Sequence, residues 1–185
     1  MSGTAGDDLL AQIDTLPRTA WSGEVYRYTT VRRDPLSGAG ARLNGGRWNP
    51  PEIFAALYLA TPVAACMAEL DRAAQSQGFP AEALLRAPYK LHTLTATQVS
   101  ILDLTDPQTL EAVGLTPDDI SSDEWEACQA VGHGAWFLHF DGVLAESASG
   151  IGQVLTLFES RLGGGQLVVQ GSEDLTVGRY RDLRM

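Results

Sequence analysis

The pattern of apolar and polar positions along the chain predicts a small number of helices. Leucine and isoleucine recur at helical spacing between residues 9 and 16, ahead of Pro17, which indicates a short amphipathic helix. Thr61 and Pro62 are typical of a helix start and Gly78 of a helix end, so a second helix is expected between them.

A third helix is expected from Trp125 to about Phe140, and its interior is unusual. Gly132 and Gly134 lie on either side of His133. A glycine costs about 1 kcal/mol relative to alanine inside a helix. We therefore predict that another segment approaches the backbone of this helix closely, or that the helix bends there.

Runs rich in β-branched and aromatic residues predict six or seven strands. The expected strands cover residues 24–30, 55–60, 89–95, 99–104, 142–145, 153–158 and 166–170. They do not alternate regularly with the helices, so the pattern favours an α+β fold over a doubly wound sheet. The 185 residues are an ordinary length for one domain, and we expect a single domain, 1–185, in which residues 1–8 are flexible.

Glycine and proline dominate the segment from Asp34 to Pro51, between the first two expected strands. Their abundance excludes regular structure over most of this segment. Because long ordered loops in compact domains usually serve a function, the segment is a candidate binding loop.

The composition excludes several classes of protein. The formal net charge of −10 argues against direct nucleic-acid binding, which depends on a dense positive surface. No apolar run approaches the ~20 residues that span a bilayer, and the polar, acidic start does not resemble a secretory leader, so we expect no membrane association and a cytoplasmic location. Cys66 and Cys128 lack metal-site spacing, and we expect both to be reduced core residues with no bound metal.

The charge is distributed unevenly. Residues 18–47 contain six arginines and two carboxylates, a local charge of +4 within an acidic chain. Arginine suits forked contacts with phosphate and carboxylate oxygens. Two interpretations stay open: a solvated basic face, or a site for a small anionic ligand.

Four residues form a candidate site. Arg27 lies on a predicted strand, Arg47 ends the glycine-rich loop, Tyr58 lies on the next strand and Glu69 on the helix after it. Two arginines can hold a pyrophosphate, a tyrosine can stack on a heterocycle, and a carboxylate can stabilise a sugar cation, which together suit cleavage of an N-glycosidic bond in a dinucleotide. Glu69 falls on the shoulder of the apolar helix stripe, so spacing alone allows either an exposed carboxylate or one that faces a cleft.

Several separated motifs resemble the RES domain family. They are Tyr26-Arg27, Ser37-Gly-Ala-Gly-Ala-Arg42, Gly45-Gly-Arg-Trp-Asn-Pro50, Leu57-Tyr-Leu-Ala60, Ala68-Glu-Leu-Asp-Arg72 and Gly142-Val-Leu-Ala-Glu-Ser-Ala148. The segment from Cys128 to His139 is further similar to the mycobacterial branch of that family, the MbcT-like toxins.

The resemblance implies the toxin of a type II toxin–antitoxin pair, with a fold similar to ADP-ribosyltransferases. Such a fold has mostly antiparallel central strands with flanking helices around an NAD cleft. Carried over by motif, Glu69, Arg27 and Tyr58 are implied catalytic residues. The implied substrate contacts are Arg27, Tyr28, Arg47, Trp48, Asn49, Tyr58 and Ser147. The family serine is implied either at Ser147 or at a position near Glu126, where this chain has a glutamate.

Three hypotheses follow from the resemblance. In the first, the protein degrades NAD+ by cleaving the nicotinamide–ribose bond, with inorganic phosphate or water as acceptor. In the second it transfers ADP-ribose to a protein, and in the third it is a catalytically weak module that binds its antitoxin. NAD+ is implied as substrate rather than as cofactor, no other cofactor is expected, and the implied partner is an antitoxin with a helical DNA-binding part.

Overall fold

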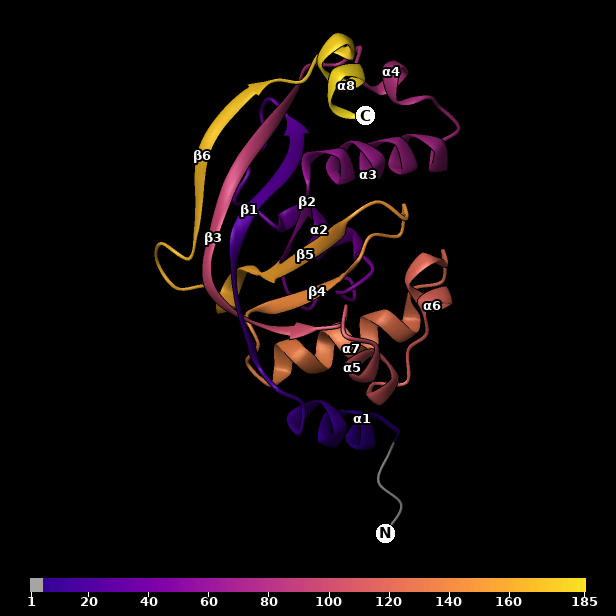
Figure 1. The fold of residues 1–185 in the computed structure, drawn as a ribbon, viewed down its shortest axis with the longest axis vertical. Coiled ribbons are helices and arrows are strands. Elements are labelled where there is room, and N and C mark those ends of the chain that lie inside the picture. The colour runs from indigo at the N-terminus through magenta and orange to yellow at the C-terminus, as the bar shows by residue number, and fades with distance from the viewer. Residues whose placement is uncertain (1–4) are drawn as a thin grey trace.

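The computed structural model describes residues 5–185 and contains one mixed sheet with helices packed on its outer face (Figure 1). The strands are β1 (Thr19–Thr30), β2 (Ala56–Thr61), β3 (Tyr89–Asp103), β4 (Gly142–Glu146), β5 (Gln153–Phe158) and β6 (Leu167–Asp174). The helices are α1 (Ala5–Asp14), α2 (Ala39–Asn44), α3 (Val63–Ser76), α4 (Ala81–Leu84), α5 (Pro107–Ala112), α6 (Pro117–Ser121), α7 (Glu126–Phe137) and α8 (Val177–Leu183), with a 3₁₀ turn η1 (Glu159–Arg161). The predicted α+β class is confirmed.

The sheet closes on itself. Its strand order is β1-β2-β5-β4-β3-β6, and β1 also pairs with β3 along nearly its whole length. In the described residues the pairing of β3 with β4 is parallel and the other pairings are antiparallel, as the resemblance implied. Apolar side chains from β1 to β6 fill the inner face and include Val25, Leu57, Leu94 and Leu155.

Two groups of helices cover the outer face. Helices α3, α4 and α8 pack at one end, and α1, α5, α6 and α7 at the other, while the β4–β5 hairpin extends between them (Figure 1). Alternation along β2 places Ala60 in the apolar cluster with α3, α4 and α8, and Ala56 in the apolar cluster with α1 and α7. Tyr58 lies between them on the same face. No helix in residues 5–185 has the length and apolar character needed to cross a bilayer.

The flexibility expected for residues 1–8 stays a prediction. Residues 1–4 of the segment expected to be flexible lie outside the described residues. Residues 5–8 form the first turns of α1.

The expected break between two strands near residue 97 is instead a kink within β3. This strand runs unbroken over 15 residues, and Gln98 takes a positive φ of 50°. The backbone N–H groups of Thr97 and Gln98 donate to the Gln166 carbonyl and the Ser22 hydroxyl. These hydrogen bonds satisfy the backbone of a polar stretch whose sequence resembles a turn, so the strand continues without a break.

The acidic segment after β3, for which the sequence pattern predicts no element, contains the two short helices α5 and α6. Asp106 caps the first of them, and Thr116 and Asp119 form a capping box at the second, each with proline as the first helical residue. Helix α2 within the glycine-rich loop and the C-terminal helix α8 were likewise not expected.

The expectation of a close approach to the third helix is confirmed. A Cβ added at Gly132 would lie 1.9 Å from the carbonyl oxygen of Trp48, and one at Gly134 would lie 2.7 Å from Cδ1 of Ile13. The two glycines let α7 pack directly against the glycine-rich loop on one side and against α1 on the other.

This packing gives the first prediction. Gly132→Ala forces a methyl group onto a backbone carbonyl and is expected to destabilise the fold by about 1–3 kcal/mol. Thermal unfolding followed by circular dichroism measures the change. Gly178→Ala in α8 is the matched control, because its added Cβ meets only Thr176 Oγ1, at 3.8 Å, and should be neutral or stabilising. Equal stability of the two variants would contradict the described contact.

Candidate active site

The centre of the candidate site is a contact between Glu69 on α3 and Ser147 just after β4. The Ser147 hydroxyl, which is buried, donates to Oε1 of the half-buried Glu69 carboxylate. The hydroxyl of Ser149 lies 2.6 Å from that of Ser147. Glu69 is therefore partly buried and bonded to another segment, rather than an isolated surface residue.

Local sequence brings these two residues together. The turn after β4 closes with a hydrogen bond from the Ser147 N–H to the Gly152 carbonyl, and Gly150 and Gly152 both take positive φ values, of 80° and 64°. A Cβ at Gly152 would lie 2.4 Å from the carbonyl oxygen of Thr61. Glycine thus allows the turn to pack against the start of α3, which sets the Ser147 hydroxyl beside Glu69.

Two groups near Glu69 are held in their neutral forms. Burial raises the pKa of the Cys66 thiol to about 12, and the Glu69 carboxylate contributes to this shift. Burial also raises the pKa of Tyr28 well above its ordinary value, again with a contribution from Glu69. Neither group therefore places a second negative charge beside the Glu69 carboxylate at neutral pH.

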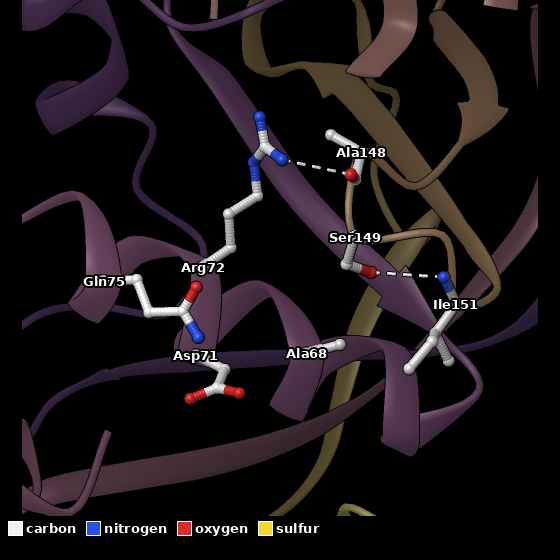
Figure 2. Close-up of a pocket in the computed structure, with 7 residues that line it drawn as sticks. All are labelled: Ala68, Asp71, Arg72, Gln75, Ala148, Ser149 and Ile151. Atoms are coloured by element: carbon white, nitrogen blue, oxygen red, sulfur yellow. Dashed lines mark hydrogen bonds between the residues drawn. The ribbon is translucent and has the colours of Figure 1, made fainter. Parts of the chain in front are cut away.

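A cavity of about 250 Å³ lies between α3 and the turn that carries Ser147 (Figure 2). It is lined by α3 and by the turn after β4, through Ala68, Asp71, Arg72, Gln75, Ala148, Ser149 and Ile151. Ser149 connects the cavity to the carboxylate through Ser147.

A second group of predicted residues surrounds Tyr58. The Tyr58 hydroxyl accepts a hydrogen bond from the Trp48 N–H at 2.9 Å and donates to Oδ1 of Asn49 at 2.7 Å. Arg47 donates to the carbonyl of Asp119 at 3.1 Å, and its guanidinium lies 5.9 Å from the ring centre of Trp125. Burial raises the pKa of Tyr58 above its ordinary value, so its hydroxyl remains protonated.

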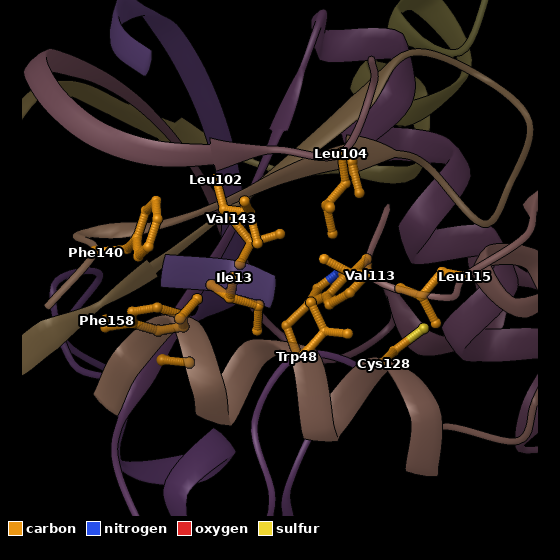
Figure 3. Close-up of a cluster of buried hydrophobic side chains, with 14 of the residues drawn as sticks. Ile13, Trp48, Leu102, Leu104, Val113, Leu115, Cys128, Phe140, Val143 and Phe158 are labelled. Carbon is orange, nitrogen blue, oxygen red and sulfur yellow. The ribbon is translucent and has the colours of Figure 1, made fainter. Parts of the chain in front are cut away.

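Trp48 and Asn49 are buried, with exposed fractions of 2% and 0%. The Trp48 side chain packs among Ile13, Val113 and Cys128 in the cluster over α7 (Figure 3). Gln129 of α7 donates to the carbonyl of Gly46 at 2.9 Å and so also holds the loop. In this structure Trp48 and Asn49 fix the loop that carries Arg47, and their direct contact with substrate stays a prediction.

Arg27 belongs to a third group. Alternation along β1 places it on the face of Val25, opposite to Tyr28, which packs toward α3. Its guanidinium donates to the carbonyls of Pro35 at 2.6 Å and Ser37 at 3.1 Å, and burial lowers its pKa. Arg27 thus holds the start of the glycine-rich loop, and no hydrogen bond within residues 5–185 joins it to Glu69.

Two neighbours of the Glu69–Ser147 pair were not among the candidate residues. Ser149 bonds to Ser147, and Arg72 donates to the carbonyl of Ala148 at 3.1 Å. The helical repeat of the expected helix between Thr61 and Gly78 places Arg72 away from the apolar stripe, and this position gives no signal of a contact with a distant turn. Glu126, the other possible position of the family serine, is exposed in the first turn of α7.

No cluster of three or more histidine, cysteine, aspartate or glutamate side chains in residues 5–185 is arranged to hold a metal ion.

Comparison with known proteins places this site in a family. The family model of the RES domain matches residues 23–177, and the chain belongs to the RES domain family. The resemblance drawn from the separated motifs is confirmed.

The chain is 52% identical over 184 residues to the curated proteins named NAD(+) phosphorylase MbcT from Mycobacterium bovis and Mycobacterium tuberculosis, covering 100% of this chain and 99% of each relative. Among solved structures it resembles a chain in the crystal structure of the M. tuberculosis MbcT–MbcA toxin–antitoxin complex. The TM-score is 0.91 at 52% identity, over 96% of this chain and 97% of that one.

The burial of Cys66 gives the second prediction. A pKa raised to about 12 leaves almost no thiolate at pH 8, so native protein should not react with iodoacetamide at this residue. Peptide mass spectrometry measures labelling, and the same protein in guanidinium chloride is the control in which both cysteines should react. Rapid labelling of Cys66 in the native protein would show that α3 does not pack against β1 as described.

Proposed function

We propose that this protein is an NAD+ phosphorylase and the toxin of a toxin–antitoxin pair. The observation that carries the proposal is the Glu69–Ser147 contact in a RES domain chain that is 52% identical to proteins named NAD(+) phosphorylase over their whole length. The neutral setting made by Cys66 and Tyr28 also supports it, because a carboxylate there can stabilise a positive charge on substrate.

In the proposed reaction the bond between the nicotinamide nitrogen and the ribose C1 breaks, and its electron pair leaves with neutral nicotinamide. The ribose carbon develops oxocarbenium character, which the Glu69 carboxylate stabilises. An oxygen of hydrogen phosphate then bonds to that carbon and gives ADP-ribose 1-phosphate. Nicotinamide leaves uncharged and needs no proton, so the proposed reaction requires no resident cofactor.

The remaining candidate residues take proposed roles around this step. Ser147 orients the Glu69 carboxylate, and Tyr58 and Tyr28 line the side where nicotinamide leaves. Arg47 binds the pyrophosphate or the attacking phosphate. Arg27 contributes positive charge and keeps the glycine-rich loop in place, as its two carbonyl contacts support.

The proposed partner is an antitoxin with a helical DNA-binding part, in the cytoplasm. The similarity to a toxin chain solved in complex with its antitoxin supports an antitoxin partner. The net charge of −10 supports assigning any DNA binding to the partner, because this chain lacks the dense positive surface that DNA requires.

The third prediction concerns the carboxylate. Glu69→Gln keeps the shape and removes the charge, and we expect the rate of NAD+ loss to fall by about 100-fold or more, measured by chromatography. Glu111→Gln, which changes an exposed glutamate on α5, is the matched control and should retain full activity. Unchanged turnover in Glu69→Gln would remove the residue from the mechanism.

The acceptor is tested in the same assay with and without phosphate. A phosphorylase consumes NAD+ only when phosphate is present and forms ADP-ribose 1-phosphate. Loss of NAD+ in both buffers with free ADP-ribose would indicate a hydrolase. Label transferred from NAD+ to a protein would indicate an ADP-ribosyltransferase, and neither loss nor label would indicate a binding module.

The fourth prediction separates the two possible positions of the family serine. Ser147→Ala removes a hydrogen bond to a charged group and should lower kcat by about tenfold or more. Glu126→Gln, on the exposed first turn of α7, should leave kcat unchanged. The reverse result would transfer the role of the serine to the start of α7.

A further inference from the structure

We infer that Arg72 is a positioning residue of this active site, which fixes the Ser147 hydroxyl against Glu69 by holding the turn that carries it. The inference rests on the proposed function, because it concerns how the same pair of residues is kept in place. It assigns a role to a residue outside the candidate set derived from the sequence.

The contacts of Arg72 join three separate segments. From α3, its Nη1 donates to the carbonyl of Ala148 at 3.1 Å, within the turn after β4 (Figure 2). Its Nη2 donates to the carbonyl of Ser121 at 3.0 Å, at the end of α6, and to Oδ1 of Asp123 at 2.7 Å, just after that helix. A planar guanidinium with five donors can hold such a set in one geometry, whereas a lysine ammonium cannot.

Arg72 and Glu69 form hydrogen bonds with consecutive residues of the same turn. They lie three positions apart on α3 and therefore on neighbouring parts of its surface. Glu69 accepts from the Ser147 side chain, and Arg72 donates to the next carbonyl, of Ala148. Two anchors on one rigid helix fix both the position of the turn and its rotation, so the hydroxyl remains directed at the carboxylate.

The same guanidinium also links the Glu69–Ser147 pair to the group of residues that includes Arg47. Arg47 donates to the carbonyl of Asp119, and Arg72 donates to that of Ser121 two residues later. Both carbonyls belong to α6. This short helix therefore accepts hydrogen bonds from Arg47, which we propose for phosphate binding, and from α3, the helix that carries Glu69.

The contacts with carbonyls matter more here than the ion pair. The Asp123 side chain is 95% exposed, and exposed ion pairs contribute little to stability. Asp123→Asn should therefore leave the site intact, whereas loss of the guanidinium fork should release the turn.

The test measures kcat and KM of Arg72→Gln and Arg72→Lys in the NAD+ assay with phosphate. We expect kcat to fall about tenfold or more in Arg72→Gln, with KM for NAD+ changed less than threefold, because orientation rather than binding is lost. Arg72→Lys retains charge and most of the length and should be intermediate. Arg86→Gln, an exposed arginine after α4, and Asp123→Asn are matched controls expected to keep the kcat of the unaltered protein.

A double-mutant cycle with Ser147→Ala decides whether Arg72 acts through Ser147. If it does, Arg72→Gln should lower kcat less than twofold further once the hydroxyl is gone. Independent, multiplicative effects would overturn the inference, as would an unchanged kcat in Arg72→Gln. If thermal unfolding shows that Arg72→Gln is not folded, the cycle with Arg72→Lys gives the decision by the same criterion.

Failure of this inference is distinguishable from failure of the proposed function. Full activity in Glu69→Gln would contradict the proposed mechanism itself. Loss of activity in Glu69→Gln and Ser147→Ala, together with a multiplicative cycle for Arg72, would leave that mechanism in place and reject only the positioning role.

Discussion

Strand β3 uses both of its edges, and the rest of the molecule depends on this double pairing. One edge pairs with β1 over most of its length, and the other pairs with β6 and then with the first residues of β4. The chain of pairings through β2 and β5 therefore returns to its start and encloses a leucine-rich interior. Because the inner face is filled, Tyr58 lies on the outer face, and Ser147 lies just beyond the end of β4.

The sequence predicted features that depend on local chemistry. Gly132 and Gly134 are costly in a helix, and their presence correctly indicated that other segments touch α7. Alternation along residues 24–30 places Arg27 and Tyr28 on opposite faces, and β1 has them so. The predicted strands and longer helices follow the same local rules, and the α+β class followed from their order.

Features that depend on distant partners could not be predicted in the same way. The polar stretch at Thr97 and Gln98 resembles a turn until it is known that their backbone N–H groups donate to the Gln166 carbonyl and the Ser22 hydroxyl. The helical repeat places Glu69 at the edge of the apolar stripe. Only the position of the turn after β4 shows that its carboxylate accepts a hydrogen bond from the Ser147 hydroxyl. The helical repeat correctly places Arg72 away from the apolar stripe of α3. Only the fold shows that its guanidinium there meets the carbonyls of Ala148 and Ser121. The N-caps at Asp106 and Thr116 are local signals, but α5 and α6 are too short for a helical repeat of apolar residues to predict them.

The Glu69–Ser147 contact joins residues 78 positions apart in the sequence. Ser147 follows the first strand of a hairpin whose second strand, β5, pairs with β2 directly before α3. A chain emerging from the ribosome thus carries its carboxylate long before it carries the hydroxyl and the strand that bring the two together. The order of synthesis therefore delays the appearance of the complete pair until residues through Phe158 have left the ribosomal tunnel, so a partially translated chain lacks this pair.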